Sequence, residues 1–78
     1  MITKAQIERD ISETVGQCYG FDYNGQSCGI DPIDDHFDMW YGYETYIAKD
    51  VDAIFSVKLY DGKTLEEILP NIENYGIR

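Results

Sequence analysis

The N-terminal segment has a clear helical pattern. Ile7, Ile11 and Val15 recur every fourth residue, so they would form one apolar stripe along a helix. Thr3 stands before the stripe, where its hydroxyl and a glutamine three residues later have the spacing of a capping box. The pattern predicts a helix over about Lys4–Gln17 that ends near a glycine.

The next segment alternates with the two-residue period of β-strands around the dipeptide Asn24-Gly25, which is the strongest short signal for a hairpin. A two-residue turn at this dipeptide predicts three cross-strand pairs: Tyr23 with Gln26, Phe21 with Cys28, and Tyr19 with Ile30. These mostly apolar positions would share one face, and the small and polar Gly20, Asp22, Ser27 and Gly29 would share the other. One apolar face is typical of a sheet that is covered on one side.

A proline in the segment Asp31–Asp35 predicts a loop there, because proline cannot serve a central ladder. A third strand is predicted over about His36–Tyr43, continuing toward Ala48, and a break at Gly42 stays open. Trp40 would point outward from this strand and lie over the glycines of the hairpin.

The stretch from Asp50 to Tyr60 fits two patterns, because its apolar residues match both helical and strand spacing. Asp50 is a good helix cap and favours a short helix. Thr64 and Glu67 form a second capping box before a final helix, in which Pro70 predicts a kink or an early stop. The tail, residues 74–78, is expected to be loose.

Together these elements predict one small α+β domain over residues 1–78. Their order is α-β-β-β-α-α, with a three-stranded antiparallel sheet and the helices packed on its one apolar face.

Charge narrows the classes of partner. The chain of 78 residues has a formal net charge of −9. Its segment 10–48 contains no Lys or Arg and carries these acids: Asp10, Glu13, Asp22, Asp31, Asp34, Asp35, Asp38 and Glu44. Such a field repels phosphate backbones and anionic lipids, so we expect neither direct nucleic-acid binding nor membrane docking.

The sequence shows no apolar leader and no apolar run of membrane-spanning length. We therefore expect a cytoplasmic protein, in which Cys18 and Cys28 are reduced thiols. Ten residues separate them and the chain has one histidine, which does not match a zinc site.

A catalytic pair would have to combine His36 with Cys18, Cys28 or Ser27, and no motif of a known catalytic family surrounds them. The sequence predicts that the protein is not an enzyme and needs no cofactor. The acids Asp31, Asp34, Asp35 and Asp38 are the most metal-like group. Their spacing does not match an EF-hand, so a solvated loop is the main interpretation and a small metal-binding domain an alternative.

The leading hypothesis is a non-enzymatic, acidic protein-interaction module. Aromatic residues are dense between Tyr19 and Tyr46, and Tyr and Trp are frequent in binding hot spots. The candidate binding residues on the outward face are Trp40, Tyr43, Asp22 and Asp38, and charge complementarity predicts a basic protein partner.

Two further questions stay open from the sequence. The acids could also imitate phosphates in a nucleic-acid mimic that inhibits a DNA-binding protein, provided that they form one continuous stripe. The expected oligomeric state is a monomer or a weak homodimer, since an exposed edge strand invites sheet extension while the net charge opposes it.

Overall fold

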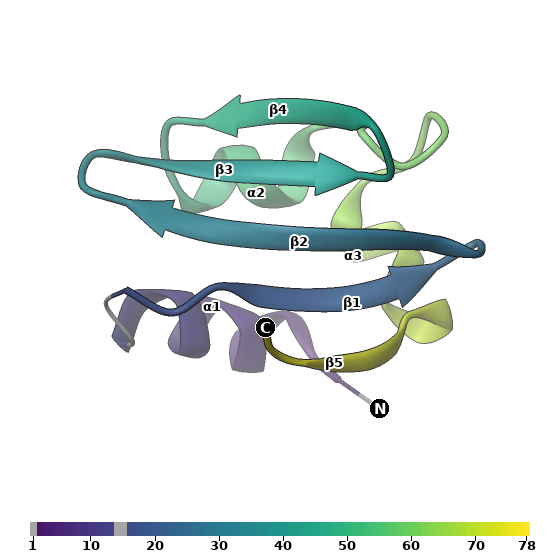
Figure 1. Cartoon of the computed structure of the whole chain (residues 1–78), viewed down its shortest axis with the longest axis horizontal. Coiled ribbons are helices and arrows are strands. Elements are labelled where there is room, and N and C mark those ends of the chain that lie inside the picture. Colours follow the sequence, from purple (N-terminus) through teal and green to yellow (C-terminus); the bar gives the residue numbers. More distant parts are fainter. Residues whose placement is uncertain (1, 14–15) are drawn as a thin grey trace.

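The computed structural model describes residues 2–13 and 16–78 of the chain. Five strands form one antiparallel sheet in the order β4-β3-β2-β1-β5. The strands are β1 Tyr19–Tyr23, β2 Gln26–Ile33, β3 His36–Tyr41, β4 Glu44–Ala48 and β5 Glu73–Ile77. The helices are α1 Lys4–Glu13, α2 Val51–Ser56 and α3 Leu65–Ile68, followed by the 3₁₀ turn η1 Leu69–Asn71. All of them lie behind the sheet in the view of Figure 1.

The small α+β architecture is as predicted, with helices on one face of an antiparallel sheet. The three-stranded sheet and the order α-β-β-β-α-α are wrong, because β4 and β5 add two strands at the two edges of the sheet. None of the helices in the described part of the chain is long and apolar enough to cross a membrane.

The central hairpin has the predicted register. Tyr23 pairs with Gln26, and the pairing continues without interruption to Tyr19 and Ile30. Asn24 and Gly25 have φ angles of 54° and 75°, so both turn residues are left-handed. This is the tight turn whose twist matches that of the two strands it joins.

The predicted loop at Asp31–Asp35 is wrong, because β2 continues to Ile33 and leaves a two-residue turn before β3. Pro32 pairs with Phe37 of β3. The pairing of β2 with β1 has already ended at Ile30, so the proline interrupts no ladder on that side.

The break left open at Gly42 is a full chain reversal. Gly42 has a φ of 60° and occupies the first central position of a two-residue turn, which favours glycine. The chain then returns as β4, which pairs with β3 from Tyr41 and Glu44 at the turn to Phe37 and Ala48 at the far end.

The prediction of a loose tail at 74–78 is also wrong, because these residues belong to β5 and its end. Tyr75 stacks on Tyr19 with ring centroids 5.8 Å apart, and its hydroxyl donates a hydrogen bond of 3.0 Å to Asp10 of α1. The backbone N–H of Arg78 donates to the carbonyl of Cys18 at 2.8 Å. These contacts fix the end of the chain to the sheet and to α1.

Helix α1 begins as predicted and ends earlier. The Thr3 hydroxyl accepts a hydrogen bond of 3.2 Å from the N–H of the third helical residue, and Ile7 and Ile11 are buried. The predicted end at Gln17 is wrong, since that residue is not helical. The third member of the stripe, Val15, lies outside the described residues.

The remaining caps are as predicted. Asp50 accepts a hydrogen bond of 2.8 Å from the N–H of Ala53, so the helical alternative for this segment is confirmed. Thr64 and Glu67 cap α3 reciprocally at 2.9 and 3.2 Å. Pro70 lies in η1, so the final helix stops early.

One core joins the sheet to the helices behind it. Its buried side chains from the strands are Tyr19, Phe21, Cys28, Ile30, Met39 and Ala48. Those from the helices and loops are Ile7, Ile11, Ile54, Phe55, Tyr60, Leu65, Ile68 and Leu69.

Candidate functional site

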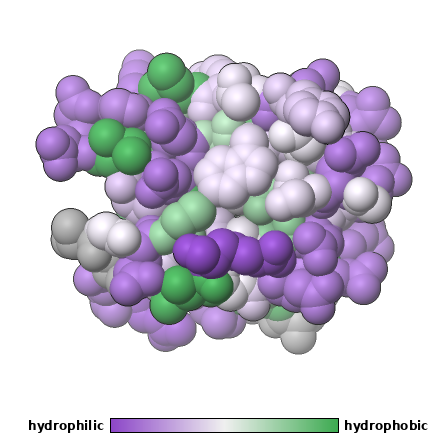
Figure 2. Space-filling model, in the orientation of Figure 1, coloured by the Kyte–Doolittle hydropathy of each residue, from purple (hydrophilic) through white to green (hydrophobic). Residues whose placement is uncertain are grey.

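The helices leave the second face of the sheet uncovered, and we call this surface the open face. The strand register gives it these residues: Gly20, Asp22, Ser27, Gly29, Asp31, Ile33, His36, Asp38, Trp40, Thr45, Ile47 and Gly76. Figure 2 looks onto the open face and shows pale to light-green side chains near its centre, a deep-purple, strongly hydrophilic group directly below them, and further hydrophilic side chains around the rim.

Two long side chains lie over a row of glycines on the open face. Gly29, Gly20 and Gly76 are neighbours across β2, β1 and β5. A Cβ atom at Gly29 would overlap the Trp40 ring, and one at Gly20 would lie 2.5 Å from Cγ of Arg78. The expected cover by Trp40 is therefore confirmed for Gly29, whereas Gly20 is covered by Arg78 instead.

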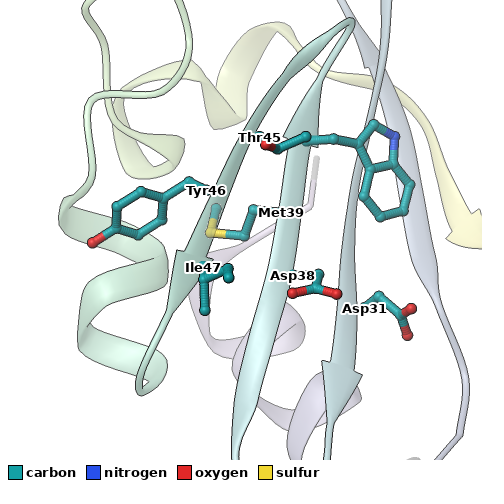
Figure 3. Close-up of a pocket in the computed structure, with 7 residues that line it drawn as sticks. Asp31, Asp38, Met39, Thr45, Tyr46 and Ile47 are labelled. Atoms are coloured by element: carbon teal, nitrogen blue, oxygen red, sulfur yellow. The ribbon is translucent and has the colours of Figure 1, made fainter.

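Trp40 borders a shallow hollow of about 500 Å³, which we call the Trp40 hollow (Figure 3). Its lining includes Asp31, Asp38, Trp40, Thr45, Tyr46 and Ile47, which come from β2, β3 and β4. The Ile47 side chain is 66% exposed, so an aliphatic surface meets water at this point. The hollow combines apolar surface with two carboxylates.

These two carboxylates face each other. Asp31 and Asp38 are direct cross-strand partners on the open face, an arrangement in which like charges destabilise a sheet. Within residues 2–13 and 16–78, neither of them forms an ion pair with a Lys or Arg side chain. The hollow is therefore negatively charged.

His36 lies at one end of this acidic group. Its Nδ1 is 2.7 Å from a carboxylate oxygen of Asp35, and its Nε2 is 3.2 Å from one of Asp38. The hydrogen bond to Asp35, with the nearby charge of Asp38, raises the pKa of His36, and the same hydrogen bond lowers the pKa of Asp35. Even when it is protonated, His36 neutralises the charge of only one carboxylate. The negative charge of Asp31 is therefore not neutralised by His36.

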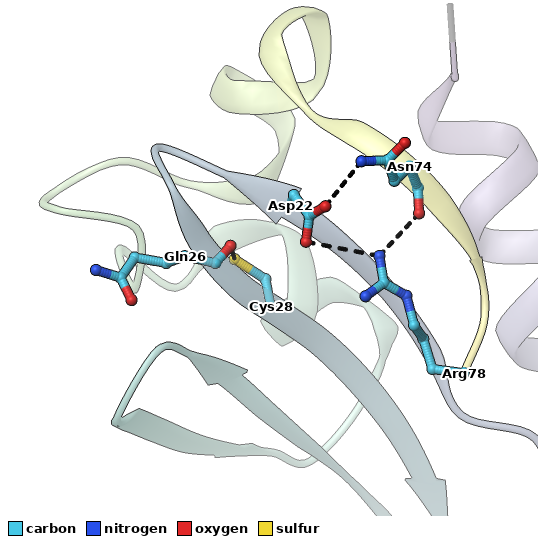
Figure 4. A network of polar contacts seen from close by, with 5 residues as sticks. All are labelled: Asp22, Gln26, Cys28, Asn74 and Arg78. Carbon is cyan, nitrogen blue, oxygen red and sulfur yellow. Dashed lines mark hydrogen bonds and ion pairs between the residues drawn. The ribbon is translucent and has the colours of Figure 1, made fainter.

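Asp22, one of the predicted binding residues, lies toward the other edge of the sheet and has partners within the chain (Figure 4). Its carboxylate accepts a hydrogen bond of 2.8 Å from the Asn74 amide and lies 3.7 Å from the Arg78 guanidinium. Arg78 also donates to the backbone carbonyl of Asn74 at 2.9 Å. Asp22 thus holds the C-terminal strand, and it does not line the Trp40 hollow.

Tyr43, another predicted binding residue, is fully exposed in the turn between β3 and β4. It lines a separate shallow hollow with Tyr41 and Glu44. Of the four predicted residues, the structure therefore brings Trp40 and Asp38 together and places Tyr43 and Asp22 elsewhere.

Sequence reasoning missed Thr45 and Ile47 as members of this surface, because it did not separate β4 from β3. The run Thr45-Tyr46-Ile47 after a glycine is a strand signal, since β-branched and aromatic residues favour strands. That signal could have been used.

The metal-like group is divided between two places. Asp31 and Asp38 face each other on the open face, whereas Asp34 and Asp35 form the turn between β2 and β3. In the part of the chain that the structure describes, no group of three or more His, Cys, Asp or Glu side chains is arranged to hold a metal ion.

The thiols are poorly placed for nucleophilic chemistry. Cys28 is buried and donates to the Gln26 carbonyl at 3.6 Å (Figure 4). Burial raises the pKa of the Cys28 thiol to about 11, and it also raises that of Cys18. A raised pKa leaves little thiolate at neutral pH. His36 lies on the open face while Cys28 points into the core, so these two do not form a catalytic pair.

The acids do not follow one stripe. Asp10 lies on α1, behind the sheet, and bonds to Tyr75, whereas Asp31 and Asp38 are on the open face. This arrangement does not provide the continuous row that a nucleic-acid mimic requires.

Known proteins give no guide to the function. No protein-family model, no curated protein and no solved structure matches the chain. The assignment of a function therefore depends on the geometry of the open face.

Proposed function

We propose that this protein is a non-enzymatic interaction module that binds a basic protein partner with its open face. The observation that supports this is the Trp40 hollow, where Trp40 and Ile47 adjoin the facing carboxylates Asp31 and Asp38. No Lys or Arg among the described residues pairs with those carboxylates.

The chemistry of the hollow fits a long cationic side chain. Its aliphatic stem would pack on Ile47, as the stems of Lys and Arg pack on apolar surfaces. Its charged head would lie between Asp31 and Asp38 and next to the Trp40 ring, which adds a cation–π attraction. The bound cation would also remove the repulsion between the two carboxylates, so binding relieves a strain of the free protein.

The dimensions of the open face suit a protein partner. Seen down its shortest axis the molecule extends 29 by 23 Å. A specific interface of standard size takes about 800 Å² from each partner. That is roughly a sixth of the 4753 Å² of accessible surface, an area comparable to this one face. The net charge of −9 would also accelerate the approach of a basic protein at low salt.

Affinity capture from the native host tests the proposal with three baits: wild type, an Asp31→Asn/Asp38→Asn double variant, and Tyr43→Ala. The double variant keeps the shape of the hollow and removes its charge, and Tyr43→Ala is a matched control outside the hollow. We expect wild type and Tyr43→Ala to retain the same basic protein and the double variant to lose it. Equal retention by all three baits, or a partner that is not basic, would overturn the proposal.

A further inference from the structure

The two edges of the sheet differ in how well they are protected against the addition of another strand. Strand β5 pairs irregularly with β1, with a shift in register between Gly20 and Asp22. Asn74 has a left-handed φ of 57°, and charged residues, Glu73 and Arg78, stand at the two ends of the strand. Bulges and charges of this kind prevent another strand from adding to an edge.

Strand β4 also has charged residues at its ends, Glu44 and the following Lys49, but it has no bulge and no left-handed residue. It pairs regularly with β3 over all five residues, and it contains no proline or glycine. Thr45, Tyr46, Ile47 and Ala48 are uncharged, and Tyr46 and Ile47 are 39% and 66% exposed. An edge strand of this type presents unpaired N–H and C=O groups to which another strand can bind.

The register also shows which backbone groups are free. The two-residue turn closes with Tyr41 opposite Glu44, and the pair next to such a turn exchanges hydrogen bonds. Since these pairs alternate along an antiparallel ladder, the N–H and C=O groups of Thr45 and Ile47 point away from β3. The same two residues line the Trp40 hollow with their side chains. A strand added at this edge would therefore lie directly beside the hollow.

We propose that the β4 edge takes up an extended, arginine-bearing segment of the basic partner as a sixth strand of the sheet. This inference rests on the proposed function and specifies its mode of binding. Alternate residues of the segment would point over the open face, where an arginine beside Ile47 would extend toward Asp38. The added strand and β3 would be two strand spacings apart, roughly 10 Å, which an arginine and an aspartate side chain can span together.

Charge selects a basic segment over a second copy of this chain. A copy that paired through its own β4 would add a segment without Lys or Arg, Glu44–Ala48, next to Asp38. It would also bring a second net charge of −9 to the interface. A segment rich in arginine supplies the missing cation and the backbone partners at once.

The first test uses a short synthetic peptide that alternates arginine with threonine, and follows its binding by Trp40 fluorescence and calorimetry. Thr45→Pro removes an outward N–H, whereas the matched variant Thr45→Val keeps the backbone donor and the side-chain shape. We expect Thr45→Pro to weaken binding about tenfold or more, and Thr45→Val to bind like wild type. Equal affinities of the two variants would overturn the inference.

A second measurement uses the wild-type protein, so it does not depend on the folding of a proline variant. Backbone amide exchange, measured by NMR, should slow at Thr45 and Ile47 when the peptide is added, and stay unchanged at Ile77 of β5, whose N–H points away from β1. Unchanged exchange along β4, or slowing at β5, would overturn the inference. If exchange at β4 slows without peptide, and slows further as the protein concentration rises, the occupant is a second copy of this chain. That result would also overturn the inference.

The two proposals can fail separately. If the natural partner is lost by the Asp31→Asn/Asp38→Asn variant while the β4 amides stay unprotected, the function stands and strand addition is wrong. If that partner is retained by the double variant, the proposed function itself is wrong.

Discussion

Two tyrosines, Tyr60 in the core and Tyr75 packed against it, allow the same chemical change to be made with opposite expected effects on stability. The Tyr60 hydroxyl is buried and, within the described residues, has no hydrogen-bond partner. The Tyr75 hydroxyl donates a hydrogen bond of 3.0 Å to Asp10. Burial raises the pKa of both phenols above their usual range, so neither is ionised near neutral pH. A change of each to phenylalanine removes one neutral hydroxyl.

Tyr60→Phe should stabilise the protein. A buried polar group without a partner costs about 1–3 kcal/mol. The phenyl ring keeps its contacts with Phe21, Tyr23 and Tyr41, whose centroids lie 5.7–6.4 Å away. The small void left by the oxygen offsets part of the gain, so we expect a net increase of about 1 kcal/mol in the free energy of unfolding. In a domain of this size that raises Tm by roughly 4–8 °C.

Tyr75→Phe should destabilise the protein. A hydrogen bond to a charged group contributes about 1.5–3 kcal/mol when it is buried. The Asp10 side chain is 22% exposed, so water can replace part of the lost contact and we expect a loss of about 1 kcal/mol. The stacking of residue 75 on Tyr19 does not need the hydroxyl and should persist.

Urea denaturation of wild type and the two single variants at neutral pH measures both changes, with Trp40 fluorescence as the signal. The double variant is a control, and its stability should be the sum of the two effects, because no hydrogen bond or ring contact joins Tyr60 to Tyr75 among the described residues. An unchanged or lower stability of Tyr60→Phe would show that its hydroxyl has a partner, such as a buried water, and would refute the reasoning.

Three further substitutions test the open face. Asp31→Asn removes one of two facing carboxylates, so the free energy of unfolding, measured by urea denaturation, should rise by about 0.2–1 kcal/mol. The pKa of His36 is raised above 6.5, chiefly by its hydrogen bond to Asp35. Protonated His36 therefore stabilises the folded protein. This stabilisation is fully present below the pKa of the unfolded state and is lost as pH rises through the pKa of the folded state. His36→Asn should therefore lower the urea midpoint at about pH 5.5 and leave it unchanged at about pH 9. Gly29→Ala would push the Trp40 ring off β2, which should destabilise the fold by about 1–3 kcal/mol and shift the fluorescence to the red.

Elements determined by neighbouring residues could be predicted from the sequence. The register of the β1–β2 hairpin follows from Asn24-Gly25, because two left-handed residues in sequence fix both the turn and the pairing. The same holds for the caps at Asp50 and Thr64, whose acceptors bond to N–H groups three residues away.

Elements determined by distant residues could not be predicted. Strand β5 contains Asn74 and Gly76, which locally favour a turn or a loose end. Its partners, Asp22 and Asp10, are 52 and 65 residues away from Asn74 and Tyr75. The sequence correctly indicates that this segment locally prefers a turn or a loose end. In the folded protein the contacts with distant residues outweigh that preference.

The candidate site was predicted in part for the same reason. Trp40 and Asp38 belong to a strand whose alternation is visible in the sequence, so their shared outward direction follows from it. Pro32 predicts a loop that includes Asp31, although a proline is tolerated where β2 has a neighbour on one side only. Tyr43 shares a face with Trp40 only if the strand continues through Gly42, and the chain reverses there instead.

The free protein has two local liabilities on adjacent strands. The facing carboxylates of Asp31 and Asp38 repel each other, and the regular β4 edge, which is uncharged from Thr45 to Ala48, favours unwanted pairing. Asp31→Asn would remove the repulsion between the carboxylates, and Thr45→Lys would protect the β4 edge against pairing. Neither substitution would alter the packing of the core. Thr45 and Ile47 border the hollow with their side chains and form the edge with their backbone, so one basic strand would relieve both liabilities together. Charge recognition and strand addition are therefore expected to occur in one binding event, and a partner that satisfies only the carboxylates should leave the β4 amides exchanging freely.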